Sequence, residues 1–242
     1  MLLKFNENTK LFLASFFYRF KEEDITEENV RTILECVLRL FTIMEVVDIG
    51  YSSSNFKTFL FGEEVKFVDP AIGVDEIKVD FDKHISEKWN RDTLKATILD
   101  YDKHTLVYLN EYLFAKERGL NFCIGAKYDI EHIMPYSGKN LSEIRKDADI
   151  DSEEEFRGIV NKLGNKILLE EKINRSIGNE WFRTKVSTKL GNKTGYIDSS
   201  YPIASVLVSD FMDVHKPYWK KDDINAATEK AAERIVKFIF NS

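Results

Sequence analysis

A glutamate and a histidine stand side by side near the middle of this 242-residue chain, as Glu131-His132, and Pro135 follows them closely. Two asparagines lie downstream, Asn165 and Asn174. A histidine with an unperturbed pKa of about 6.5 is largely neutral at neutral pH and can take a proton from water. Carboxylate and amide oxygens suit Mg²⁺ or Mn²⁺ better than zinc. The pattern therefore predicts a metal-dependent site that cleaves phosphodiester bonds.

The local structure must let both members of the pair reach one substrate. In a continuous strand Glu131 and His132 would point to opposite faces. They can act together only if the strand ends there, and Pro135 helps to end it. Asn165 lies just before a second predicted strand, where its amide could tie the long intervening loop to the backbone near His132. That would be a structural role.

The fold class predicted from the whole chain is α+β and mostly helical. Apolar residues recur at helical spacing in several segments, and Thr26 is placed to cap one of them. Residues 77–81 alternate apolar and polar, which indicates an extended segment or loop. The predicted helices are 8–20, 24–46, 55–67, 91–117, 154–162, 180–190 and 222–240.

The pattern changes after residue 120. Residues 122–124 and 128–131 resemble an extended ribbon, a loop-like acidic stretch covers 137–153, and 166–169 resembles a second strand. Strand, long loop, strand and helix form a small ββα unit. We therefore expect a helical domain or linker region over residues 1–118 and the unit that carries the chemistry over residues 119–242.

The composition excludes several classes of protein. A hydrophobic content of 43% and a charged content of 31% describe an ordinary globular chain. The two cysteines, Cys36 and Cys123, form no CxxC pair, which excludes a cysteine-built zinc site and a disulfide framework and suits a reducing compartment. The apolar run at residues 11–17 is too short for a signal peptide or a membrane span. We expect a soluble, cytoplasmic protein with no membrane partner.

Charge is unevenly distributed although the net charge is −6. Residues 172–193 hold six Lys or Arg and one acid, whereas residues 147–155 hold six acids and no base. The basic stretch lies close to the candidate site and is compatible with phosphate binding. Most such runs are solvated faces, so charge alone does not identify a partner.

Three blocks of sequence carry a resemblance to a known family. They are Asp129-Ile-Glu-His-Ile-Met-Pro135, Leu163-Gly-Asn-Lys-Ile-Leu-Leu169, and Asn174 with Lys185. Together they resemble the His-Me finger (HNH) nuclease domain at the C-terminus of GmrSD-type, modification-dependent (Type IV) restriction endonucleases. They are also similar to the HNH domain of RNA-guided CRISPR nucleases. The resemblance covers about residues 120–240, and more loosely the helices before them.

The resemblance implies a role for each residue of the constellation. His132 would be the general base, and Glu131 and Asn174 would bind one divalent cation, Mg²⁺ or Mn²⁺. Asp129 shares the strand face of Glu131. It would bind the cation directly or support one of its ligands through a hydrogen bond. Asn165 would be the middle asparagine that holds the fold. The implied activity is that of a DNA endonuclease or nickase in a restriction or anti-phage system.

Phosphate contacts and partners also follow from the resemblance. Lys185, and less directly Arg175, would contact phosphate. The family often carries an arginine three residues after the position of Ile224, where this chain has Ala227, so that contact is lost. The NTP-hydrolysing N-terminal domain of those enzymes is not found in this sequence. We expect an NTPase or specificity domain joined N-terminally or acting in trans, and the chain would then be a fragment or half of a split system.

Each of these residues also has a structural interpretation. Alone, His132 would be a hydrogen-bonded core histidine, and the two asparagines would be turn or cap residues. Lys185 and Arg175 could belong to a solvated helix face. Packing or surface roles are the simpler readings of several further residues that could touch a ligand: Trp181, Phe182, His84, His104 and His215.

Two other functions remain open at this stage. A catalytically idle module could grip DNA with the ββα unit and dock an NTPase partner through its helical half. RNA could replace DNA as the substrate, because no segment is recognisable as a reader of the 2′-hydroxyl group.

Overall fold

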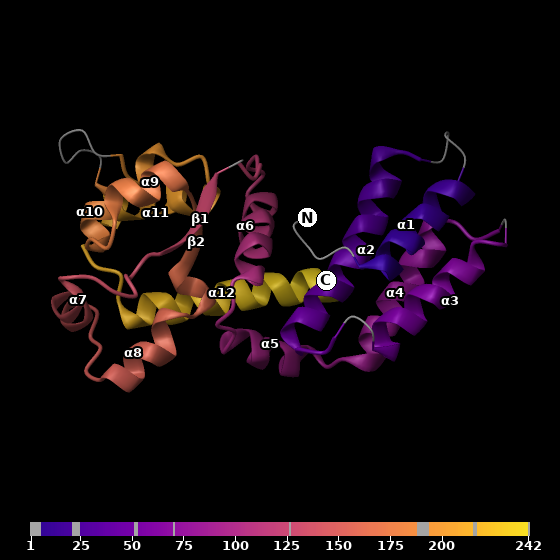
Figure 1. The fold of residues 1–242 in the computed structure, drawn as a ribbon, viewed down its shortest axis with the longest axis horizontal. Helices are drawn as coiled ribbons and strands as arrows, with labels where there is room; N and C mark the ends of the chain where they lie inside the picture. The colour runs from indigo at the N-terminus through magenta and orange to yellow at the C-terminus, as the bar shows by residue number, and fades with distance from the viewer. Residues whose placement is uncertain are drawn as a thin grey trace. The chain divides into compact units, whose positions relative to one another are not determined.

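The structure is a computed structural model that describes residues 6–20, 25–50, 53–69, 71–125, 127–187, 194–214 and 217–241, with only the backbone at 211–214. The chain divides into two compact units, Met1–Thr97 with Val236–Ser242, and Ile98–Ile235. Each is built mainly of helices (Figure 1). The fold is therefore α+β and mostly helical. The sequence-based division at residue 118 stays a prediction.

The first unit is a packed set of helices. Helix α1 packs against α3, and α2 packs against α4, around fully buried phenylalanine rings that include Phe12, Phe41 and Phe81. Its elements are α1 (Glu7–Arg19), α2 (Glu27–Val46), the π-helical turn η2 (Ser54–Thr58), α3 (Phe59–Lys66), α4 (Val74–Lys88) and most of α5 (Arg91–Leu99).

Helix α2 begins directly after Thr26, the residue predicted to cap it. The Thr26 side chain accepts a hydrogen bond from the backbone N–H of Asn29 at 3.1 Å, which satisfies one of the free donors of the first turn. Glu27 and Glu28 follow in that turn, where their charge favours the positive end of the helix.

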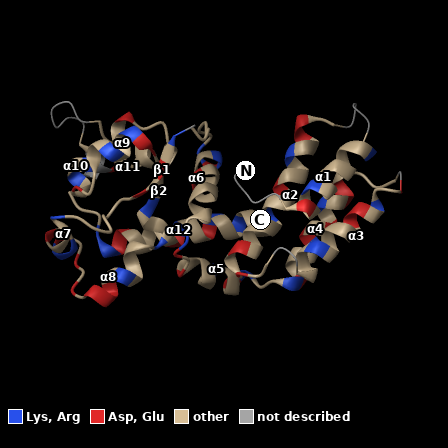
Figure 2. Ribbon diagram, viewed as in Figure 1, with Lys and Arg blue, Asp and Glu red and all other residues tan. Residues whose placement is uncertain are grey.

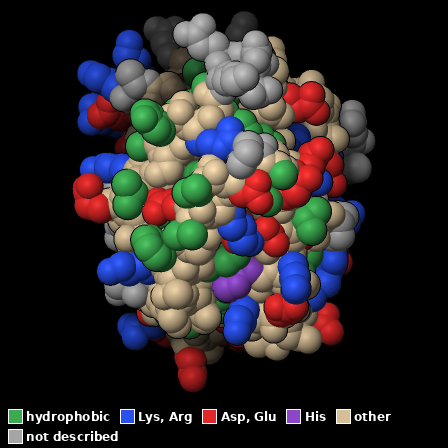
Figure 3. Space-filling model, turned by 90° about the vertical axis from the view of Figure 1, so that its right-hand side faces the viewer, with side chains coloured by type: hydrophobic (Ala, Val, Ile, Leu, Met, Phe, Trp, Pro, Cys, Tyr) green, Lys and Arg blue, Asp and Glu red, His purple; other side chains and the backbone are tan. Residues whose placement is uncertain are grey.

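Apolar side chains also remain on the surface of the first unit. Tyr18 of α1 is 94% exposed, and Phe61 and Val65 of α3 are 62% and 56% exposed. Figure 3 shows apolar side chains interspersed with charged ones on the face that it presents. Scattered apolar residues are normal on a protein surface, so they need no functional explanation.

The second unit contains the sheet. Its elements are α6 (Thr105–Glu117), β1 (Tyr128–His132), α7 (Leu141–Asp147), α8 (Glu153–Val160), the 3-10 turn η3 (Leu163–Asn165), β2 (Lys166–Glu170), α9 (Glu171–Ile177), α10 (Phe182–Val186), the 3-10 turn η4 (Tyr196–Asp198), α11 (Pro202–Val214) and α12 (Lys221–Phe240), the last of which continues into the first unit.

Strands β1 and β2 pair antiparallel, with Glu131 opposite Ile167 and His132 opposite Lys166. Strand residues alternate between the two faces. Ile167 belongs to an apolar cluster with Ile173 of α9 and Phe182 of α10, so α9 and α10 cover the face that carries Glu131. The other face carries His132, whose strand partner is Lys166.

One segment was predicted wrongly in the first unit. Residues 77–81 lie inside α4 and do not form an extended segment. Ile77, Phe81 and Ile85 recur at helical spacing and are fully buried, and the Glu76 side chain accepts from the Gly73 N–H at 2.9 Å to start the helix. The burial of these apolar side chains on one face of α4 decides the structure, although the apolar and polar residues alternate over 77–81.

Other boundaries also differ from the prediction. Residues 91–117 form two helices, α5 and α6, and the predicted acidic loop contains α7. Residues 121–125 form no strand, and α11 had no counterpart in the prediction. The helix predicted over 180–190 is α10, only Phe182–Val186, and residues 188–193 lie outside the described part of the chain, as does His215. Within the described residues, no helix is long and apolar enough to cross a membrane.

Candidate active site

His132 is the last residue of β1. Its ring is half-buried, and its Nε2 atom lies 3.3 Å from the Oδ1 atom of Asn161, which ends α8. Two exposed rings flank it: the centroids of His104 and Tyr136 lie 6.5 Å and 6.3 Å from that of His132. The His132 ring is therefore approached by side chains from three separate segments: the residue before α6, the loop after β1 and the end of α8.

Burial lowers the pKa of His132 to about 4, because the charged imidazolium is poorly solvated there. The hydrogen bond with Asn161 opposes this shift, whereas the nearby Lys166 ammonium adds to it. At neutral pH the ring is consequently neutral and carries a lone pair. That is the form that can accept a proton from water.

Glu131 lies on the opposite face from His132 and is 6% exposed. Its Oε1 atom accepts hydrogen bonds from the Lys185 ammonium and, at 3.1 Å, from the Tyr196 hydroxyl. Among the described residues, both of these bonds fall on Oε1. The second oxygen, Oε2, is thus left to meet a further ligand.

Lys185 is fully buried and donates to Glu131 and to two backbone carbonyls, those of His132 at 2.7 Å and Ile133 at 3.1 Å. Burial lowers the pKa of its ammonium group, while the Glu131 carboxylate opposes that shift. Its three oxygen acceptors enclose this ammonium group, so in the structure Lys185 holds Glu131 and the end of β1. The phosphate contact predicted from the sequence stays a prediction.

Asp129 and Asn174 meet on the same face as Glu131. The Nδ2 atom of Asn174, on α9, lies 3.0 Å from Oδ2 of Asp129, on β1. The Asn174 amide also carries an acceptor oxygen, and rotation about its last side-chain bond would turn that oxygen toward this position. One helical position further on, Arg175 has a side chain that is 76% exposed and pairs with Glu171. Of the two predicted phosphate contacts, only Arg175 is on the surface.

Asn165 is completely buried and ties the loop after β1 to the start of β2. Its Oδ1 accepts from the Met134 N–H at 2.8 Å, and its Nδ2 donates to the carbonyls of Met134 and Val160 at 3.0 and 2.8 Å. Its own carbonyl accepts from the Ile133 N–H at 2.9 Å. These bonds fix the backbone directly after His132, and the side chain has no route to a substrate.

The donors near β1 are compatible with a hard divalent cation. Among the described residues, no group of three or more His, Cys, Asp or Glu side chains could hold a metal by itself. The oxygens available are those of Asp129, Asn174 and Oε2 of Glu131. Mg²⁺ is usually held by one or two carboxylates together with water and substrate phosphates, so such a small oxygen set fits that ion.

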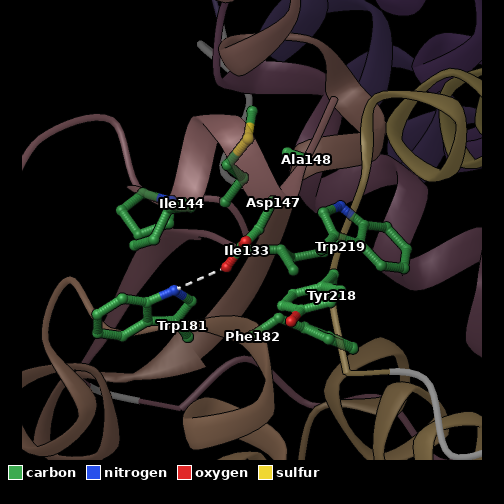
Figure 4. A pocket seen from close by; sticks show the side chains of 10 residues that line it. Ile133, Ile144, Asp147, Ala148, Trp181, Phe182, Tyr218 and Trp219 are labelled. Atoms are coloured by element: carbon green, nitrogen blue, oxygen red, sulfur yellow. Dashed lines mark hydrogen bonds between the residues drawn. The ribbon is translucent and has the colours of Figure 1, made fainter. Parts of the chain in front are cut away.

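Two hollows in the described part of the second unit differ in size and lining. A space of about 10 Å³ lies beside Ile133, between Trp181 and Trp219, where the Trp181 indole donates to Asp147 at 3.2 Å (Figure 4). It has room for about one water molecule. A larger hollow of about 650 Å³ is lined by charged side chains of α7 and the loop after it, such as Arg145 and Lys146. Neither of these two spaces is lined by Glu131, His132 or Asn174.

Sequence reasoning missed three residues that contact the site. Tyr196 and Asn161 are isolated in sequence from the three motif blocks, and no spacing rule connects them to Glu131 or His132. Lys166 could have been found, because an antiparallel register that ends at His132 places it directly opposite. Its ammonium is buried and its pKa falls to about 8 through burial.

Comparison with known proteins gives one result. The sequence profile of the GmrSD restriction endonucleases, C-terminal domain, matches residues 76–234, about two thirds of the chain. No curated protein and no solved structure matches. The matched range includes β1, β2 and α9, and it also takes in α5, α6 and most of α4. The chain belongs to the family of GmrSD restriction endonuclease C-terminal domains.

Proposed function

We propose that the chain is a metal-dependent DNA endonuclease or nickase of the HNH type, the nuclease part of a restriction system that acts on foreign DNA. The observation that carries this proposal is the neutral, half-buried His132 at the last position of β1, within the region that matches the family. Beside it, on the other face of the same short strand, lie Asp129 and Asn174.

The two faces can act on one phosphate at the edge of β1. Among the described residues, the sheet has two strands, so one edge of β1 has no strand partner. A phosphodiester that lies along this edge near His132 has the imidazole on one side and the Asp129–Asn174 pair on the other. The end of the strand at His132 is what gives both faces access to it.

In the proposed reaction His132 accepts a proton from the attacking water. Asp129, Asn174 and the free oxygen of Glu131 would hold Mg²⁺ or Mn²⁺, which would supply positive charge for the developing charge of the phosphorane and the 3′ leaving oxygen. Lys185 and Tyr196 keep the Glu131 carboxylate in place. Arg175 would contact the DNA backbone, and Asn165 holds the segment after His132.

The charge distribution supports a nucleic-acid substrate near α9. Lys172, Arg175 and Arg183 are exposed on or next to the helices that cover the Asp129 face, while acids gather at the start of α8 (Figure 2). Surface cations supply the sequence-independent part of DNA binding. An NTPase domain or subunit that selects the DNA would act together with this chain.

The decisive experiment is cleavage of supercoiled plasmid in Mg²⁺ or Mn²⁺ by the wild-type chain and by His132→Ala. We expect nicked or linear product from the wild type, a loss of about 10²–10⁴-fold in the variant, and no cutting with a chelator. Cutting that survives His132→Ala would exclude this residue as the base. Inertness of both proteins with either metal would favour a DNA-binding adaptor. Cutting of RNA but not DNA would show that the substrate is RNA.

A further inference from the structure

We propose that His104 is a second substrate-contacting histidine, which donates an N–H hydrogen bond to the scissile phosphate beside His132. The inference rests on the proposed nuclease function. It names a residue that would bind the phosphate, since the Lys185 side chain is enclosed. Sequence reasoning alone favours a packing or surface role for this residue.

The position of His104 is the first argument. Its ring is exposed and stands edge to face with that of His132, at a centroid separation of 6.5 Å and an interplanar angle of 84°. It is the residue before α6, but its side chain makes no capping hydrogen bond to that helix. Both imidazoles can therefore point toward one small ligand at the end of β1.

The loop that carries His104 is held firmly, which is the second argument. Lys166, the strand partner of His132, is buried and donates its ammonium protons to the carbonyls of Asp102 and Lys103, the latter at 3.2 Å. These carbonyls belong to the two residues directly before His104. One buried side chain thus ties the position of His104 to the strand that ends with His132.

The local charge is the third argument. The Lys166 ammonium lowers the pKa of His104, after the larger effect of the partial burial of this ring. The same positive field favours a phosphodiester anion between the rings. A neutral His104 ring retains one N–H, and a hydrogen bond to a charged oxygen is stronger than one between neutral groups. Lys185 is enclosed and cannot supply such a bond.

Two substitutions separate hydrogen bonding from packing. His104→Phe keeps an aromatic ring against His132 but removes the donor, whereas His104→Gln keeps an N–H donor and removes the ring. With the cleavage position mapped, we expect His104→Phe to lower kcat/KM by about 10–100-fold, mainly through KM, as for a lost bond to a charged group. His104→Gln should recover most of the loss. The unfolding midpoints of both should remain close to that of the wild type.

Modified DNA then identifies the atom contacted. Binding is measured on the His132→Ala background with an oligonucleotide that carries a neutral methylphosphonate at the mapped scissile position, each stereoisomer separately. Adding His104→Phe should weaken binding to the ordinary phosphate but leave binding to one methylphosphonate stereoisomer unchanged, because that isomer already lacks the acceptor.

Several results would overturn the assignment. They are a wild-type kcat/KM in His104→Phe, equal losses in the Phe and Gln variants with lowered unfolding midpoints, or an equal His104→Phe penalty on both stereoisomers and on the ordinary phosphate. None of them affects the assignment of His132, which depends on the His132→Ala cleavage alone. If the wild type cuts no substrate, the nuclease function itself fails.

Discussion

The ammonium group of Lys185 lies among three oxygen acceptors, one carboxylate and two backbone carbonyls. Its side chain has no exposed surface, and that of Glu131 is 8% exposed. Buried ion pairs are sensitive to the loss of one partner, because the remaining charge is left without compensation. At the scale of single residues, this pair is the part of the site most vulnerable to substitution.

We expect Lys185→Met to destabilise the protein by about 3–5 kcal/mol, because Glu131 would be left buried without its counter-charge. Urea denaturation measures the change. The double variant Lys185→Met with Glu131→Gln removes both charges and should recover part of the loss. If Lys185→Met instead folds with wild-type stability but binds DNA more weakly, the phosphate contact predicted from the sequence would be supported over the structural role.

Gly164 and Asn165, the two residues directly before β2, have separate structural roles. A Cβ atom at Gly164 would lie 2.4 Å from both the Ile224 carbonyl oxygen and the Thr228 backbone nitrogen. The Gly164 N–H also donates to the Thr228 hydroxyl at 3.1 Å. The glycine allows α12 to approach the turn before β2, and Asn165 then fixes the segment that follows His132.

At the scale of elements, Gly164→Ala should separate α12 from this turn. The clash involves backbone atoms that cannot rotate away, so we expect a loss of about 1–3 kcal/mol or more. Cleavage should fall as well, because Asn165 is the next residue. Thermal or urea unfolding, together with plasmid cleavage, measures both effects.

Gly158→Ala is the matched control for that substitution. Gly158 lies within α8, and a Cβ there would meet no atom within 4 Å. Alanine favours a helix over glycine by about 0.5–1 kcal/mol, so this variant should be as stable as the wild type or slightly more so. Equal behaviour of the two alanine variants would argue against the close approach at Gly164.

Glu111 joins three elements of the second unit. This fully buried carboxyl of α6 accepts from the Ile203 N–H of α11 at 2.7 Å and also from the backbone N–H of Leu168 in β2. Burial raises its pKa to about 8, whereas the bonds to these backbone groups oppose the rise. The folded protein therefore holds a proton on Glu111 at pH values where the unfolded chain has released it.

The whole molecule should consequently become less stable as pH rises. The stabilising contribution of the protonated Glu111 is fully present below its unfolded pKa of 4.5 and is lost as the pH passes through about 8. Glu111→Gln stays neutral and should lose less stability over this range. Urea midpoints of both proteins at pH 5 and pH 8.5 test this, because their difference cancels the other titrating groups. Parallel pH profiles would contradict it.

Sequence patterns could predict the helix-rich fold and both strands, because amphipathic spacing and the motif blocks are local signals. The Thr26 cap, α12 and the pairing of two strands across a long insertion follow from such signals. The alternation at residues 77–81 gave a wrong prediction because five residues fit both the strand period and the helix period. The burial of Ile77 and Phe81, which distinguishes the two, is known only from the structure. Side-chain environment was harder still: no pattern distinguishes an enclosed Lys185 from an exposed Arg175.

The partners of Glu131 come late in the chain, since Lys185 and Tyr196 follow it by 54 and 65 residues. During synthesis, a chain that has emerged only through Asn174 contains every residue of the motif except Lys185, but nothing yet holds the carboxylate or closes α12 over Gly164. The site around Glu131 can therefore assemble only after Lys185, Tyr196 and α12 have been made. A minimal fragment that retains it must reach from the loop before α6 into α12.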